Sequence, residues 1–230
     1  DILERRDSMA LVIMNELESF KKEYKRARRT AIENAEEAVY KEKELEEMDV
    51  MFLMDRFGYA KTIDMATYER NKEAADNENR HVIQVMNTGK LVVFTDTGKV
   101  HQIKVLDVPF GKFRDKSVPI DNYSNFDSAA ERIVAVYALS DVLEEKLLFV
   151  TKTGMVKIVA GSEFDVAKKT IASTKLAEDD EVIGVFRLEK SEFTVLQSKA
   201  GYFIKLALSD IPEMKKTAVG NHGIKLGAKD

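Results

Sequence analysis

Apolar residues recur three and four positions apart from the start of the chain to Tyr24, and the positions between them are mostly charged. This period is typical of an amphipathic helix and predicts one over residues 2–26. Thr30 is a good N-cap residue, so a second helix is predicted over residues 31–40. Residues 1–46 are therefore expected to form a helical segment.

The pattern changes at Val50, where short apolar runs rich in Val, Ile, Leu and Phe alternate with polar turn residues. Runs of this length and composition are typical of β-strands, and their close spacing indicates a mainly β body over residues 47–230. The clearest predicted strands are Val50–Met54, Leu91–Thr95, Ile133–Leu139, Leu147–Thr151, Val182–Leu188 and Phe193–Gln197.

A repeated unit accounts for this body. Four times, an apolar strand is followed by a polar turn, a glycine and a second strand that carries a cation. The glycines are Gly58, Gly98, Gly154 and Gly201, at intervals of 40, 56 and 47 residues. Glycine suits a tight hairpin turn because it adopts positive φ without strain. Repeats of this length with several short strands predict propeller-like blades that must stack to bury both of their faces.

Lysines follow these glycines at a fixed distance. Fourteen residues after each glycine the chain has a lysine, and three units add a second cation close by. Equivalent positions of a radial array lie on one rim, so these cations predict a basic stripe that could contact a nucleic-acid backbone through its phosphates. The alternative is that they are ordinary lysines of solvated loops. The residues concerned are Lys72, Lys112, Arg114, Lys168, Lys169, Lys215 and Lys216.

Net charge does not distinguish these two interpretations. The 36 Lys and Arg residues and the 40 Asp and Glu residues give a formal charge of −4, which excludes a polybasic protein. Ten basic and 12 acidic residues lie in 1–46, which leaves 26 and 28 for 47–230. The basic cluster at residues 25–29 is either a solvated helix end or a further phosphate contact.

Candidate enzyme chemistry is sparse. The chain has no cysteine, which excludes disulfides, thiolate zinc sites and a cysteine nucleophile. His81 and His101 are expected at the surface of strands or loops, and Asp179–Asp180 in a turn rather than a metal site. No run of apolar residues is long enough to span a membrane. We therefore predict no catalytic residue and no metal ligand.

At this point the motifs resemble a known family. Thr151–Lys157 reads Thr-Lys-Thr-Gly-Met-Val-Lys, Asp210–Gly220 contains Ile-Pro followed by two lysines, and Gly-Ile-Lys-Leu stands at Gly223–Leu226. Lys175–Leu176 and Asp180–Val185 repeat the same ending one unit earlier. In this order the motifs resemble the C-terminal domain of the A subunit of bacterial type II topoisomerases, that is, DNA gyrase and topoisomerase IV.

The front of the chain extends this resemblance. Glu16–Tyr24, Arg28–Thr30 and Ile32–Glu33 are similar to the end of the same subunit's breakage-reunion region, where a helix leaves the coiled coil. The resemblance implies a β-pinwheel, here of about four blades in an open ring, whose blades exchange strands. The division is then 1–46 for the helical segment and 47–230 for the pinwheel, and both ends look like cuts in a longer protein.

The resemblance also implies a function. The domain would bind and bend double-stranded DNA beside the cleavage core of an ATP-dependent enzyme. Its partners would be the B subunit of the enzyme, a second copy of the A subunit, and no membrane. ATP and magnesium would be used by the B subunit, with no cofactor in this fragment, and the location would be cytoplasmic, at the nucleoid. The DNA-binding residues would be Lys61, Arg70, Lys72, Lys112, Arg114, Lys157, Lys168, Lys169, Lys205, Lys215 and Lys216.

One departure from the family concerns its glycine-rich basic box in the first blade. At that place the chain reads Tyr68–Asp76, without the double glycine and with the acids Glu69, Glu73 and Asp76. Because this box wraps DNA tightly in gyrase, weak wrapping is expected, closer to topoisomerase IV or to a diverged gyrase. A propeller scaffold that binds a protein partner remains the alternative function.

Overall fold

The computed structural model describes residues 5–31 and 46–227 and divides the chain into two units, 1–45 and 46–230. In the first unit, α1 (Arg6–Tyr24) confirms a helix in the predicted place, slightly shorter than 2–26. None of its residues is buried, so its apolar stripe is open to solvent. The second predicted helix, over residues 31–40, lies almost wholly outside the described residues.

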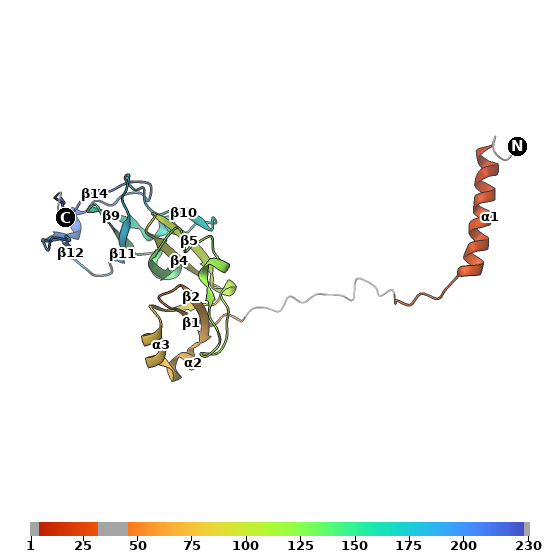
Figure 1. The fold of residues 1–230 in the computed structure, drawn as a ribbon, viewed down its shortest axis with the longest axis horizontal. Helices are drawn as coiled ribbons and strands as arrows, with labels where there is room; N and C mark the ends of the chain where they lie inside the picture. Colours follow the sequence, from red (N-terminus) through yellow and green to blue (C-terminus); the bar gives the residue numbers. More distant parts are fainter. Residues whose placement is uncertain (1–4, 32–45, 228–230) are drawn as a thin grey trace. The chain divides into compact units, whose positions relative to one another are not determined.

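Short antiparallel strands make up the second unit (Figure 1). The strands are β1 (Asp49–Met54), β2 (Tyr59–Asp64), β3 (His81–Met86), β4 (Lys90–Thr95), β5 (Lys99–Lys104), β6 (Val118–Pro119), β7 (Ile133–Ala138), β8 (Lys146–Thr151), β9 (Met155–Ala160), β10 (Thr170–Ala172), β11 (Val182–Arg187), β12 (Phe193–Gln197), β13 (Phe203–Ala207) and β14 (Asn221–His222). The helical turns are α2 (Met65–Arg70), α3 (Lys72–Glu78), η2 (Val105–Asp107), η3 (Ile120–Asn122), α4 (Leu139–Val142), η4 (Gly161–Phe164) and η5 (Leu208–Asp210).

Four separate sheets form, and they exchange strands. Their orders are β3-β1-β2-β6, β7-β4-β5-β10, β11-β8-β9-β14 and β12-β13. In the first three, the last strand comes from a later part of the chain, after the hairpin of the next sheet. The first strands of these sheets, β3, β7 and β11, contact one another in succession. The exchanged strands β6, β10 and β14 therefore lie at the opposite, outer edges.

Turn chemistry explains why each hairpin forms where it does. The four repeat glycines all have positive φ, between 73° and 89°. A polar side chain at the start of each of three turns accepts a hydrogen bond from the backbone N–H four residues on: Asp55 from Tyr59 (3.0 Å), Thr151 from Met155 (3.2 Å) and Ser198 from Tyr202 (3.3 Å). Such side-chain bonds replace backbone pairing in a tight turn.

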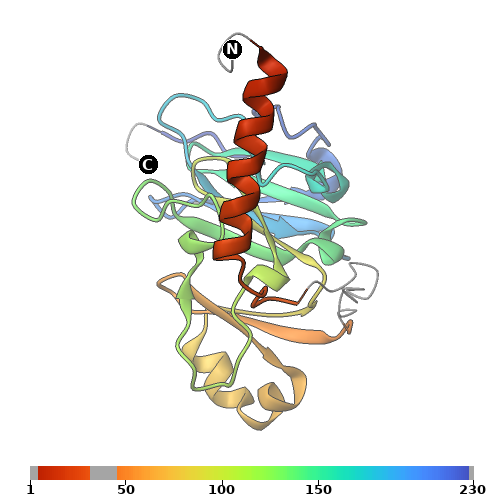
Figure 2. The same cartoon turned by 90° about the vertical axis from the view of Figure 1, so that its right-hand side faces the viewer.

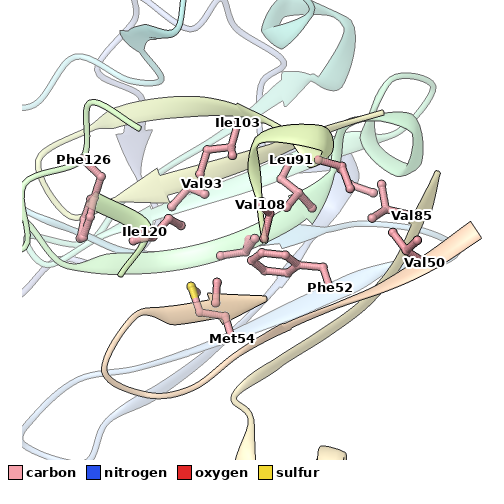
Figure 3. Packing of buried hydrophobic residues seen from close by; sticks show 14 residues of the cluster. Val50, Phe52, Met54, Val85, Leu91, Val93, Ile103, Val108, Ile120 and Phe126 are labelled. Carbon is pink, nitrogen blue, oxygen red and sulfur yellow. The ribbon is translucent and has the colours of Figure 1, made fainter. Parts of the chain in front are cut away.

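The core lies between neighbouring sheets. Figure 3 shows Phe52 and Met54 of β1 on one side and Leu91, Val93 and Ile103 of the second sheet on the other, in one buried cluster. A second cluster joins the second and third sheets, and a third joins the third and fourth. Neighbouring blades thus share buried clusters, as the repeat predicts. The first sheet also buries its other face, where Leu53 and Ile63 pack with Tyr68 of α2 and Ala75 of α3.

The predicted fold class is confirmed: the protein is mainly β, a pinwheel of four sheets with a helix near its N-terminus. All six of the clearest predicted strands form, but Leu139, predicted as the end of a strand, begins α4 instead. The helices α2 and α3 were not expected; they lie at one end of the β unit, beside β1 and β2 (Figure 2). None of the described helices is long and apolar enough to cross a membrane.

Candidate nucleic-acid interface

Three loops lead to the exchanged outer strands, and we call them the exchange loops. They are residues 108–117 before β6, 165–169 before β10 and 211–220 before β14. Each follows a short 3-10 turn and crosses from one sheet to the outer edge of the sheet before it. The predicted basic loop positions, except Lys72, lie on these three segments.

Most of the predicted cations on the exchange loops are free to meet a ligand. Lys112, Arg114, Lys168, Lys169 and Lys215 are all exposed. Lys216 is half-buried because its Nζ donates to the carbonyl of Glu163 at 2.6 Å, and its backbone N–H donates to the Glu163 carboxylate at 2.9 Å. The outer edges of the first three sheets therefore carry these exposed cations on neighbouring exchange loops.

Two of the predicted DNA-binding lysines do not lie in this exposed group. Lys61 on β2 is half-buried, and its ammonium donates to the carbonyls of Phe113 and Asp115, the latter at 3.0 Å. Lys157 on β9 is 1% exposed. Burial lowers the pKa of the Lys157 ammonium to about 8, against the opposing attraction of Glu163. Both lysines point into exchange loops rather than to solvent.

Lys205 differs from them by one register position. In the hairpins, Lys61 pairs with Leu53 and Lys157 with Phe149, and the matching pair in the fourth sheet is Ile204 with Leu196. Adjacent residues of a strand point to opposite faces, so Lys205 faces the other way. It is exposed and lies over the Phe193 ring at 3.9 Å.

The position of the family's basic box is helical. Asp64 caps α2, accepting bonds from the N–H and hydroxyl of Thr67 at 2.7 and 2.6 Å. These bonds lower the pKa of the Asp64 carboxyl. Arg70 is exposed and bonds to the carbonyl of Ala66 (3.2 Å), and Lys72 is exposed at the start of α3. Lys72 is thus not equivalent to Lys112 and Lys215, because its segment returns to β3 of the same sheet.

The predicted surface position of His101 is wrong. It is 1% exposed, because it occupies the register position of Lys61 and Lys157 in the second sheet. Its Nε2 is 3.0 Å from the Glu131 carboxylate and its Nδ1 is 2.9 Å from the Thr170 hydroxyl. Burial opposes ionisation of Glu131, but hydrogen bonds from Thr95, His101 and Thr97 lower its pKa overall.

The remaining candidates do not form a site. His81 is half-buried on β3, and burial together with Arg80 lowers its pKa to about 4. Asp180 lies in a turn, as expected, but its carboxylate is buried and binds the N–H and hydroxyl of Thr153 at 2.9 and 2.7 Å. Within residues 5–31 and 46–227, no three His, Cys, Asp or Glu side chains are grouped so that they could hold a metal ion.

Comparison with known proteins agrees with this architecture. A family model described as the DNA gyrase C-terminal domain, β-propeller, matches residues 145–189 and 193–230. The DNA gyrase A subunit of Lawsonia intracellularis is 28% identical over 95% of this chain, and that of Helicobacter pylori is 28% identical over all of it. This chain resembles the C-terminal domain of the DNA gyrase A subunit. The resemblance drawn from its motifs is thereby confirmed.

Solved structures show the same fold. The C-terminal domain of DNA topoisomerase IV superposes with a TM-score of 0.70 at 22% identity, covering 80% of this chain and 59% of that one. The E. coli ParC C-terminal domain gives 0.63 at 15%, covering 79% and 73%. At these identities the match shows the fold alone. The chain spans 28–29% of the length of the two gyrase proteins named above.

Proposed function

We propose that residues 47–230 form the DNA-binding and DNA-bending domain of a bacterial type II topoisomerase A subunit. The observation that carries the proposal is the placement of Lys112, Arg114, Lys168, Lys169 and Lys215, all exposed on exchange loops at the outer edges of successive sheets. A row of cations with no built pocket suits phosphates of a bent duplex and gives little sequence preference.

The proposal extends to the intact enzyme. It would be ATP-dependent and cytoplasmic, and the partners of this chain would be the B subunit of the enzyme and a second copy of the A subunit. The B subunit would use ATP and magnesium. Residues 1–46 would be the end of the breakage-reunion region, which leads into the pinwheel.

Salt dependence tests the DNA contact. Each phosphate contact on a duplex should contribute about −0.9 to the slope of log K against log salt concentration. Replacing Lys112, Lys168 and Lys215 by Glu should weaken binding to all sequences alike and flatten that slope by about 3. Unchanged affinity in the triple variant would show that these exchange-loop lysines do not contact DNA. If the parent chain binds no duplex at low salt, the protein-binding scaffold is favoured instead.

We further propose that wrapping is weak. The support is the helical segment α2–α3 at the box position, where Glu69, Glu73 and Asp76 stand near the exposed Arg70 and Lys72. Acids at this place oppose a tightly held phosphate backbone. The intact enzyme should therefore relax or decatenate DNA better than it introduces negative supercoils. Efficient ATP-dependent negative supercoiling of a relaxed plasmid would show that this part is wrong.

A further inference from the structure

The ammonium groups of Lys61 and Lys157 each occupy the centre of an exchange loop. Lys157 Nζ lies 3.3, 3.0 and 2.7 Å from the carbonyl oxygens of Lys215, Lys216 and Ala218. No carboxylate forms an ion pair with it among the residues that the structure describes. Backbone carbonyls thus replace the water that burial removes from this charge.

The same arrangement recurs two sheets away. Thr62 bridges to Phe110 and Ile158 bridges to Glu213, both in parallel, so the two loops have one register. In that register Phe113 matches Lys216, and Asp115 matches Ala218. The carbonyls of Phe113 and Asp115 accept from Lys61. The carbonyls of Lys216 and Ala218 accept from Lys157. Independent recurrence of the same donor–acceptor pairs indicates a device of the fold rather than a chance contact.

Loop length varies together with this lysine. From the first residue of the 3-10 turn to the exchanged strand, the chain advances 13 positions in the first loop (105 to 118) and 13 in the third (208 to 221). In the second loop the residue in the same register is Ile171, the second residue of β10, because it pairs with Val100 as Val118 pairs with Ala60. The advance there is 10 (161 to 171). Only the two longer loops enclose the ammonium of a lysine from the neighbouring strand, namely Lys61 of β2 and Lys157 of β9. The shorter one brings Thr170 directly beside His101 instead.

We propose that Lys61 and Lys157 are positioning residues that hold the first and third exchange loops in place. The loops then present Lys112 and Lys215 to DNA phosphates, and neither Lys61 nor Lys157 touches the DNA. Lys112 and Lys215 occupy matching loop positions, and Lys215 is itself one of the residues whose carbonyl binds Lys157. This inference rests on the proposed function and reassigns two residues that the family resemblance places among the DNA-binding residues.

A mutant cycle tests the assignment in the full chain. Lys157→Met removes the ammonium and keeps the length of the side chain; Lys215→Gln with Lys216→Gln removes the loop charges. Lys157→Met should weaken duplex binding several-fold in the parent chain and have no further effect in the double Gln background. The matched control is Lys152→Met, which removes an exposed lysine from the turn of the same hairpin. Equal weakening in both backgrounds, or none in either, would overturn the proposal.

Amide hydrogen exchange separates this result from the proposed function. The N–H groups of Met214 and Ala218 bond to the carbonyls of Ile158 and Lys215. In Lys157→Met they should exchange faster, with the strands β8 and β9 still protected; unchanged protection contradicts the positioning role even if no DNA is bound. If the parent chain binds no DNA, the proposed function fails. Amide exchange at Met214 and Ala218 still shows whether Lys157 holds the third exchange loop. Should Lys157→Met not fold, Lys61→Met with exchange at Gly111 and Asp115 replaces it.

Discussion

The second sheet and its two neighbours achieve the same strand exchange with different chemistry. In the first and third sheets, a lysine ammonium binds the carbonyls of a long loop. In the second, His101 bonds to Glu131 and to Thr170 of the exchanged strand itself. The same register position is thus filled in two ways: a lysine where the exchange loop is long, and a histidine where it is short.

The comparison shows what a buried polar group contributes here. The ammonium sites depend on backbone atoms, so they constrain a loop's path and leave its side chains free to vary. The histidine site depends on Glu131, Thr97 and Thr170 as particular partners. We therefore expect the second sheet to be more sensitive to single substitutions than the first or third.

Glu131→Ala should have the largest effect. It leaves the buried Nε2 of His101 without its acceptor, and one unsatisfied buried group of this kind costs up to about 3 kcal/mol. It also removes the bond from the hydroxyl of Thr97, but Thr97 is exposed and its hydroxyl can bond to water. Urea denaturation should show this loss at neutral pH. Because the Glu131 pKa is lowered in the folded protein, its contribution is present above about pH 4.5, its ordinary pKa, and disappears as pH falls through the folded value. A loss below about 0.5 kcal/mol would show that the partners re-pair.

Lys157→Met should destabilise the third sheet less, by about 2 kcal/mol at pH 7, since the carbonyls it leaves can take up water. The pH dependence is distinctive. With a folded pKa of about 8 against the ordinary 10.5, the unfolded chain holds the extra proton between these values, so the lysine-containing protein gains stability as pH rises through that window. Denaturation at pH 7.5, 9 and 10.5 should show that the difference in unfolding free energy between the parent and Lys157→Met widens as pH rises. The unfolding free energy of Lys152→Met should change with pH as that of the parent does. A constant difference between the parent and Lys157→Met would contradict the burial of the charge.

Much of this architecture could be predicted from the sequence. The four glycines located the hairpins because positive φ leaves a clear sequence signal. The loop lysines were found for a similar reason, since their offset from the glycine is fixed by the length of one strand and one turn. The resulting expectation that Lys112 and Lys215 occupy matching positions agrees with the register of their loops.

What the sequence could not supply is burial and register. Lys157 and Lys205 look alike in the repeat, but one extra residue between Gly201 and its lysine turns Lys205 to the other face. His101 looked like a surface residue because Glu131, its partner, is 30 positions away along the chain. The helices α2 and α3 interrupt the repeat at the place where a loop was expected, and only the Asp64 cap and the lack of glycine hinted at them.

The smallest expected effect concerns this helical segment, where the first sheet departs from the other two. Asp64→Ala removes two bonds to Thr67 and should cost about 1 kcal/mol, the usual value of an N-cap side chain. Thermal unfolding measures the loss, and Asp64→Asn, which can still accept from the Thr67 N–H, is the matched control. Phe113 of the first exchange loop packs against the same buried cluster as Tyr68 and Ala75, but the cap bonds of Asp64 do not reach the exposed cations of that loop. The salt slope of DNA binding should therefore stay as in the parent. A flatter dependence of DNA affinity on salt concentration would instead show that α2–α3 contributes to the DNA contact. The first sheet would then differ from its neighbours in structure but would bind DNA as they do.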